Sequence, residues 1–163
     1  MMDSKSMGYR IEWLTKFMFP VHLMDCWSMY ILDTNKKVMM VLDQTETDPT
    51  DEMKIKHDSL ARKFQQRFCC LMNDVFGVFG GELVETGGWS FVYPLVAQHE
   101  PCSSEDNGVY MVHYFKEFTG LYLRSTLNQA QIDDMRKKLA YEIVTMKGNK
   151  GDIPEFLYEA TID

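Results

Sequence analysis

The sequence lacks the features of several large classes of protein. Its four cysteines form no C-x-x-C pair and no zinc-ligand spacing, so neither a metal site nor a disulfide framework is indicated. No segment approaches the roughly 20 apolar residues of a membrane-spanning helix, and no apolar signal segment is recognisable at the start. Positive charge is also scarce, because 17 Lys and Arg face 24 Asp and Glu, giving a net charge of −7.

These absences narrow the expected environment and partners. The acidic balance disfavours nucleic acid and anionic membranes as partners. Cysteines without a pairing pattern are typical of reduced thiols in a cytosolic or nuclear protein. We therefore expect no metal or other cofactor and a location in the nucleus or cytoplasm.

What the chain does contain is enough apolar material for a packed core. Its 163 residues are 45% hydrophobic and 13% aromatic, which favours a folded domain over disorder. The 13 methionines are expected to fill irregular gaps in that core. We predict one domain over residues 1–163, with a core at about 11–147 and a weakly patterned C-terminal tail at 148–163.

The spacing of apolar residues predicts the order strands, helix, strand, helix, helix. Two of the strands flank the polar turn at residues 33–37 and are expected to form an antiparallel hairpin. This order is typical of an α+β fold with a small mixed sheet flanked by helices. The expected strands are residues 17–23, 27–32, 38–43 and 89–96. The expected helices are residues 56–76, 108–118 and a last one beginning at 128.

Local signals refine three of these elements. Asn128 and Gln131 have the spacing of a capping box at the start of the last helix. Gly77, with the glycines that follow it, is expected to end the long helix. Trp89 is expected in the core of the fourth strand, with a surface role as the alternative. The predicted core stripe of the long helix is Leu60, Phe64, Phe68, Leu71, Met72 and Val75.

Four short segments resemble one enzyme family in their order and spacing. Residues 20–27 read Pro-Val-His-Leu-Met-Asp-Cys-Trp, and residues 41–43 read Val-Leu-Asp. Residues 106–110 read Asp-Asn-Gly-Val-Tyr, and residues 135–142 read Met-Arg-Lys-Lys-Leu-Ala-Tyr-Glu. Together they resemble the Ulp1/SENP family of SUMO-specific cysteine proteases, in particular its divergent plant members. The resemblance implies a papain-like, Ulp1-type α+β fold, with the N-terminal part of the family domain shortened.

The resemblance also assigns the catalytic positions, and two of them have lost their chemistry. Asn107 stands at the nucleophile position, where a carboxamide cannot form an acyl-enzyme. Cys26 stands at the histidine position, where a thiol with an ordinary pKa of about 8.5 is a poor general base. Asp43 keeps the identity of the triad acid but has lost its imidazole partner. Gln98 is the candidate for the oxyanion glutamine, although it lies nine residues before Asn107 in a loop longer than the family's.

The binding surface of such a domain is separable from its chemistry. The resemblance implies that Trp27 lines a tunnel for the Gly-Gly tail of a ubiquitin-like modifier, with Asp106 and Gly108 flanking the nucleophile position. We therefore predict a catalytically inactive homologue, a pseudoprotease, that acts as a protein-binding or regulatory module. Its expected partner is another protein, such as a ubiquitin-like modifier or its conjugate.

An active peptidase with a rearranged site is the alternative. Cys102 with His99 is the conceivable replacement pair, although neighbouring loop residues seldom form a buried, oriented dyad. His22 is expected to be non-catalytic and hydrogen-bonded within the sheet. His113 is expected to be a packed or surface residue of its helix.

Overall fold

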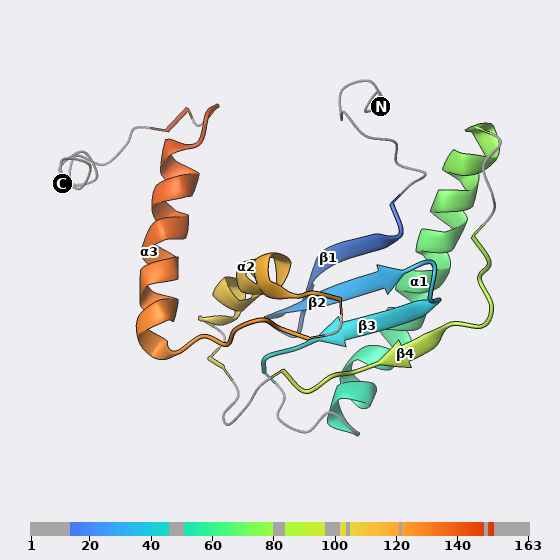
Figure 1. The fold of residues 1–163 in the computed structure, drawn as a ribbon, viewed down its shortest axis with the longest axis horizontal. Coiled ribbons are helices and arrows are strands. Elements are labelled where there is room, and N and C mark those ends of the chain that lie inside the picture. The colour runs from blue at the N-terminus through green and yellow to red at the C-terminus, as the bar shows by residue number, and fades with distance from the viewer. Residues whose placement is uncertain are drawn as a thin grey trace. The chain divides into compact units, whose positions relative to one another are not determined.

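A computed structural model of the protein shows a mixed four-stranded sheet and three helices within the described residues (Figure 1). The described residues are 14–45, 51–79, 84–96, 102–103, 105–120, 122–148 and 150–151. The elements are β1 (Lys16–Leu23), β2 (Cys26–Asp33), β3 (Val38–Leu42), α1 (Glu52–Phe79), β4 (Ser90–Val92), α2 (Asn107–Glu117) and α3 (Gln129–Thr145). The predicted α+β class is confirmed.

The sheet has the order β1-β2-β3-β4. β1, β2 and β3 form an antiparallel meander, so the predicted hairpin of the second and third strands is confirmed. Met24 and Asp25 connect β1 to β2 with φ angles of 51° and 58°, the left-handed conformation that a two-residue type I′ turn needs. β4 then pairs in parallel with β3, and α1 makes the crossover between them.

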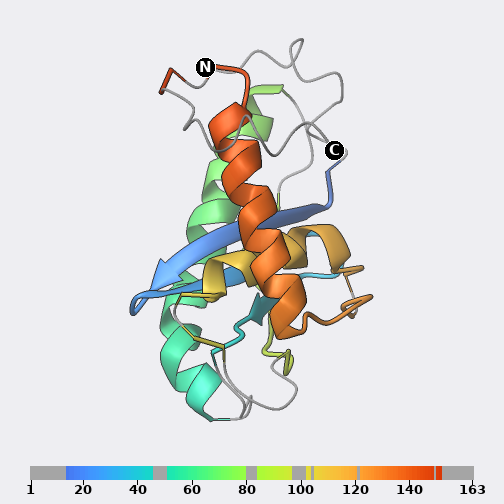
Figure 2. The same cartoon turned by 90° about the vertical axis from the view of Figure 1, so that its left-hand side faces the viewer.

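The core lies between the two central strands and α1. Tyr30 and Leu32 of β2 and Met39 and Val41 of β3 are fully buried in one cluster with apolar residues of α1. Met29 and Ile31 are also buried although they alternate with the cluster residues, so β2 is covered on both faces, as its apolar sequence predicts. Figure 2 shows α1 (green) running along one side of the strands.

The long helix departs from the prediction at both ends. It spans 28 residues and continues through Gly77, which therefore does not end it. Leu71 and Val75 were expected in the core stripe but are exposed, whereas Cys69 is buried. Leu71 and Val75 are four residues apart and share one face of α1. Met72, the residue after Leu71, is buried in the core, so the face that carries Leu71 and Val75 is turned away from the sheet.

Two further elements can be compared with the prediction. β4 covers only residues 90–92, because Pro94 has no N–H for the ladder and the expected strand at 89–96 cannot continue past it. The capping box of α3 is confirmed: Gln131 N donates to Asn128 Oδ1 at 3.0 Å, and Asn128 N donates to Gln131 Oε1 at 3.0 Å.

The chain divides into two compact units, Met1–Lys116 and Glu117–Asp163, with the boundary at the end of α2. The first unit contains the sheet and α1, and the second contains α3. Among the described residues, no helix combines the length and apolar character needed to cross a membrane.

Candidate functional site

Asn107, the residue at the predicted nucleophile position, is the first residue of α2 and is fully buried. Its Nδ2 donates to the carbonyl oxygen of Trp27 at 2.7 Å, and its Oδ1 accepts from the backbone N–H of Trp27. These two bonds join residues that are 80 positions apart in the chain. The side chain at the nucleophile position therefore fastens α2 to the start of β2, next to Cys26, and both ends of its carboxamide are in use.

The turn before α2 is organised by Asp106. Its backbone carbonyl accepts from Val109 N at 2.9 Å, and its carboxylate accepts from Ser103 Oγ at 2.9 Å. Gly108, by contrast, is not required by packing, because a Cβ at this position would meet nothing within 4 Å. Of the two residues that flank Asn107, Asp106 stabilises the turn by hydrogen bonds, whereas the packing around Gly108 does not require a glycine.

Asp43 is fully buried at the end of β3, and its two carboxylate oxygens are saturated. Oδ2 accepts from Lys56 Nζ at 2.8 Å and lies 2.8 Å from His57 Nε2. Oδ1 accepts from the N–H and the hydroxyl of Thr45 at 2.8 and 2.6 Å. The prediction that Asp43 lacks an imidazole partner is therefore wrong: α1 supplies one from the residue after Lys56.

The imidazole of His57 is not placed to act as a general base. His57 is fully buried, and its second nitrogen, Nδ1, lies 3.0 Å from the hydroxyl of Tyr30. With Asp43 on one nitrogen and Tyr30 on the other, neither nitrogen is available to take a proton from a nucleophile. The Asp43–His57 pair is a buried connection between β3 and α1.

The charge of Asp43 follows from the balance of two effects. Burial raises the pKa of this carboxyl, but the hydrogen bonds from His57, Lys56 and Thr45 outweigh burial and hold the pKa well below its usual value. Asp43 is therefore an ionised carboxylate at neutral pH, facing the ammonium of Lys56 at 2.8 Å.

Cys102 lies in the same neighbourhood as the predicted catalytic positions. Its backbone N–H donates to the carbonyl of Gln44 at 3.0 Å, and its thiol is hydrogen-bonded by the side chain of Asn107. Burial, together with the negative charge of Asp43, raises the pKa of the Cys102 thiol to about 12. Because the thiolate is the nucleophile, this thiol is unreactive at neutral pH. Cys26, half-buried at the start of β2, also acts electrostatically on Cys102.

Several residues of this network were not predicted from the sequence: Tyr30, Gln44, Thr45, Lys56, His57 and Tyr114. Gln44 follows Asp43 directly and accepts a hydrogen bond from the buried hydroxyl of Tyr114 in α2. His57 extends the apolar stripe of α1 one turn toward its start, since it precedes Ala61 by four residues. A polar residue in register with a core stripe is the signal that would have found it.

The predicted binding residue Trp27 is partly open to solvent. Its side chain is 40% exposed although its backbone is held by Asn107. The ring of His22, an exposed residue of β1, lies against it with 4.9 Å between centroids and the two planes tilted by 52°. His113 is buried beside Tyr114, which matches the packed alternative. Gln98 and His99 lie outside the described residues.

Comparison with known proteins gives a match in fold. No protein-family model and no curated protein matches the sequence. A structure of the SUMO protease Ulp1 with its catalytic cysteine oxidized to a sulfonic acid matches with a TM-score of 0.56 at 19% identity. Structures of Ulp1 with the same cysteine oxidized to a sulfinic or a sulfenic acid match with TM-scores of 0.55 and 0.54, also at 19% identity.

The match covers a larger share of this chain than of Ulp1. It includes 86% of this chain and 58% of the Ulp1 chain in the sulfonic acid structure, so the chain spans less than two thirds of that protein. The other two structures give 86% and 57%. At this identity the likeness concerns the architecture: the chain has the α+β fold of the Ulp1 protease.

Proposed function

We propose that this chain is a catalytically inactive form of the Ulp1-type protease fold that binds another protein through the surface around Trp27. The observation that supports it best is the pair of hydrogen bonds between the Asn107 carboxamide and the backbone of Trp27. A carboxamide is not a nucleophile, and both ends of this one are hydrogen-bonded to the backbone of Trp27.

The rest of the predicted triad supports the same conclusion. Acyl transfer needs a nucleophile with its base in hydrogen-bonding reach and the reacting carbonyl about 3–3.5 Å away. Here the position of the base holds Cys26, a thiol. The acid, Asp43, is bound to Lys56 and His57 in the core. Each catalytic position thus has a residue that either lacks the chemistry or is engaged elsewhere.

The surface beside the closed site retains features of a binding site. Trp27 is 40% exposed, and Met24 at the tip of the β1–β2 turn is 76% exposed. Large aromatic side chains next to open apolar surface are frequent anchors in protein interfaces. Because the matching fold is that of a SUMO protease, a ubiquitin-like modifier is the partner that we propose for this surface.

One observation favours an active cysteine peptidase as the second candidate. The thiol of Cys102 lies within hydrogen-bonding reach of Asn107, and hence close to the nucleophile position. Against it stands the pKa of about 12, which leaves almost no thiolate at neutral pH. We rank this candidate second for that reason.

An experiment with electrophilic modifiers separates the two candidates. The chain is incubated with SUMO and with ubiquitin, each bearing a cysteine-reactive group at its C-terminus, and intact mass is recorded. We expect no adduct with either. An adduct that disappears in Cys102→Ala would establish the peptidase and contradict our proposal.

The binding part of the proposal is tested by calorimetry with unmodified SUMO and ubiquitin. We expect one of them to bind, and Trp27→Ala to weaken the complex at least about tenfold, as for a buried aromatic anchor. Tyr122→Ala is the matched control, since it removes another exposed aromatic ring from the second compact unit. Absence of binding by both modifiers, or equal losses in the two variants, would contradict a ubiquitin-like partner at Trp27.

A further inference from the structure

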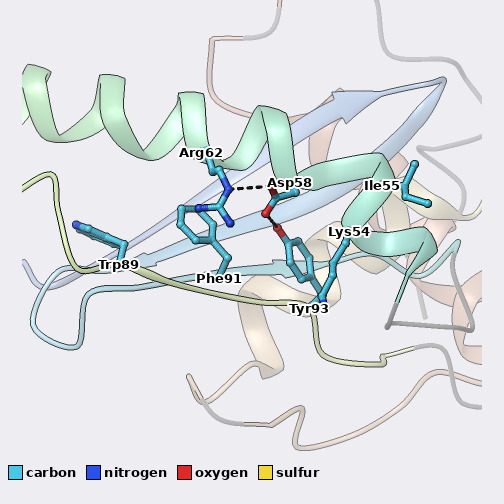
Figure 3. A pocket seen from close by; sticks show the side chains of 7 residues that line it. All are labelled: Lys54, Ile55, Asp58, Arg62, Trp89, Phe91 and Tyr93. Carbon is cyan, nitrogen blue, oxygen red and sulfur yellow. Dashed lines mark hydrogen bonds and ion pairs between the residues drawn. The ribbon is translucent and has the colours of Figure 1, made fainter.

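A groove between α1 and the segment around β4 shares no residue with the protease-like site (Figure 3). Its volume is about 560 Å³. The residues that line it are Lys54, Ile55, Asp58, Arg62, Trp89, Phe91 and Tyr93. The first four come from α1 and the last three from the chain at β4, so the groove has a helical wall and an aromatic wall.

The spacing of the lining residues along α1 and along the chain at β4 explains why they form two facing rows. Lys54, Asp58 and Arg62 are four residues apart and therefore share one face of α1. Trp89, Phe91 and Tyr93 alternate along extended chain and therefore share the side of the sheet that faces the helix. Figure 3 shows the two rows facing each other across the groove.

Asp58 joins the two walls and holds their side chains in place. Its Oδ1 accepts from the hydroxyl of Tyr93 at 3.0 Å, and its Oδ2 accepts from Arg62 Nε at 2.7 Å. The guanidinium of Arg62 in turn lies 4.3 Å from the centroid of the Phe91 ring. The groove is thus organised before any ligand arrives, which lowers the cost of binding.

The charges of the groove select an anionic ligand. The hydrogen bond from Arg62 lowers the pKa of Asp58, so this carboxyl is ionised and offset by the guanidinium. Lys54, exposed at one end, adds a positive charge, which leaves the lining at +1 in a chain of −7. A ligand carboxylate would be attracted to Lys54 and Arg62, whereas a cationic ligand would be repelled by both.

The backbone beside the groove suits an extended ligand. Among the strands of the described residues, β4 is at an edge of the sheet, because the order is β1-β2-β3-β4. Edge strands offer backbone N–H and C=O groups to an added strand. Apolar side chains are also open to solvent around this edge: Ile55 is 83% exposed and Leu95 is 51% exposed.

We propose that this groove binds an extended segment of a partner protein in which acidic and aliphatic residues alternate. The segment adds to β4 as a further strand. Successive residues of a strand point to opposite sides of the sheet. On the side that faces α1, the acidic side chains of the segment lie near Lys54 and Arg62. On the opposite side, its aliphatic side chains lie beside Val92 of β4, which is 40% exposed. This goes beyond the function proposed above, since it needs neither Trp27 nor any residue of the closed site.

The test uses the full chain and a fluorescein-labelled decapeptide of alternating valine and glutamate, with fluorescence anisotropy as the readout. We expect saturable binding. Two control peptides are expected not to saturate: one with lysine for every glutamate, and one with alternate backbone nitrogens methylated so that they cannot pair with β4. No saturation by the valine–glutamate peptide up to about 1 mM, or equal binding of either control, would overturn the proposal.

Variants locate the site. Lys54 is an exposed residue. We expect Lys54→Glu to weaken peptide binding at least about tenfold, because it reverses the charge beside the ligand carboxylate. Lys63→Glu is the matched control, with the same charge change on an exposed residue of α1 outside the groove, and it is expected to have little effect. If both variants lost the same amount of peptide affinity, the effect would come from the overall charge of the protein, and the assignment of the peptide to this groove would be wrong.

Trp27→Ala separates this inference from the proposed function. Peptide binding should be unchanged in this variant, because Trp27 does not line the groove. A loss of peptide binding in Trp27→Ala would show that the peptide occupies the surface of the protease-like site, which would overturn the inference.

Discussion

The protease-like site and the α1–β4 groove satisfy their polar groups in different ways. In the protease-like site, Asn107 and Asp43 are fully buried, and every hydrogen-bonding atom of their side chains has a partner within the protein. In the groove, Asp58 is likewise paired, but Arg62 and Lys54 remain open to solvent. The polar side chains of the first region are closed off by bonds within the protein, whereas the groove has exposed charge and aromatic rings that are open to a ligand. The predictions below test this difference.

Replacing Asp43 should lower the free energy of unfolding more than any other substitution considered below. In Asp43→Asn the new NH₂ group must face donors in either orientation of the amide: Lys56 and His57, or the backbone N–H of Thr45. The negative charge opposite Lys56 is lost as well. Breaking a buried ion pair on one side costs about 3–5 kcal/mol. We expect a loss of this size in the free energy of unfolding, measured by urea denaturation.

The matched replacement in the groove is Asp58→Asn. Asp58 is also paired with a cation, but the Arg62 side chain is 54% exposed, so water can replace the lost partner. We expect Asp58→Asn to lower the free energy of unfolding much less than Asp43→Asn does. Similar losses for Asp43→Asn and Asp58→Asn would remove the distinction between a closed and an open region.

Removing the carboxamide of Asn107 should have the next largest effect. Asn107→Ala leaves the partly buried N–H and C=O of Trp27 without their partners, which costs about 2 kcal/mol. Asn128→Ala, which removes an exposed helix cap, is the comparison and should cost about 1 kcal/mol. We expect Asn107→Ala to have the lower melting temperature of the two variants. If its melting temperature equals or exceeds that of Asn128→Ala, the bonds to Trp27 do not stabilise the fold.

Acid should weaken the fold through Asp43. Its pKa is lowered by folding, so the carboxylate stabilises the protein above the unfolded pKa of about 3.9, and this stabilisation is lost as pH falls below that value. For one such group the loss by pH 3 is about 1 kcal/mol. We expect the free energy of unfolding to fall less between pH 5 and pH 3 in Asp43→Asn than in the unmodified chain. Parallel curves for the two proteins would mean that other groups cause the acid sensitivity.

The order of the elements was predictable from the sequence because apolar periodicity and capping residues act locally. The polar turn at residues 33–37 between two apolar runs predicted the β2–β3 hairpin, and Asn128 with Gln131 predicted the start of α3. The exposure of Leu71 and Val75 was not predictable, because it depends on which face of α1 is turned toward the sheet: Met72, the residue after Leu71, is buried.

The positions of the candidate site residues could be predicted from the sequence, but the contacts of these residues could not. The resemblance located Cys26, Asp43 and Asn107, since these positions follow from motif order. The partners of Asp43 and Asn107 are contacts between distant segments, such as the bonds across 80 residues from Asn107 to Trp27. A motif describes neighbours in sequence, so it could not show that His57 binds Asp43 or that an amide closes the site.

The smallest expected effect is at Gly108, a residue that the protease motif contains but that packing here does not require. Gly108 lies in the first turn of α2, and an added Cβ would meet nothing within 4 Å. Because alanine favours a helix over glycine, Gly108→Ala should leave the melting temperature unchanged or raise it, corresponding to at most about 1 kcal/mol. A lower melting temperature would show that the start of α2 is more tightly packed than its neighbours indicate. A variant of unchanged stability that no longer binds a ubiquitin-like modifier would show that the space above Gly108 is used by a partner, and the site around Asn107 would then be open to ligands despite the bonds that close it.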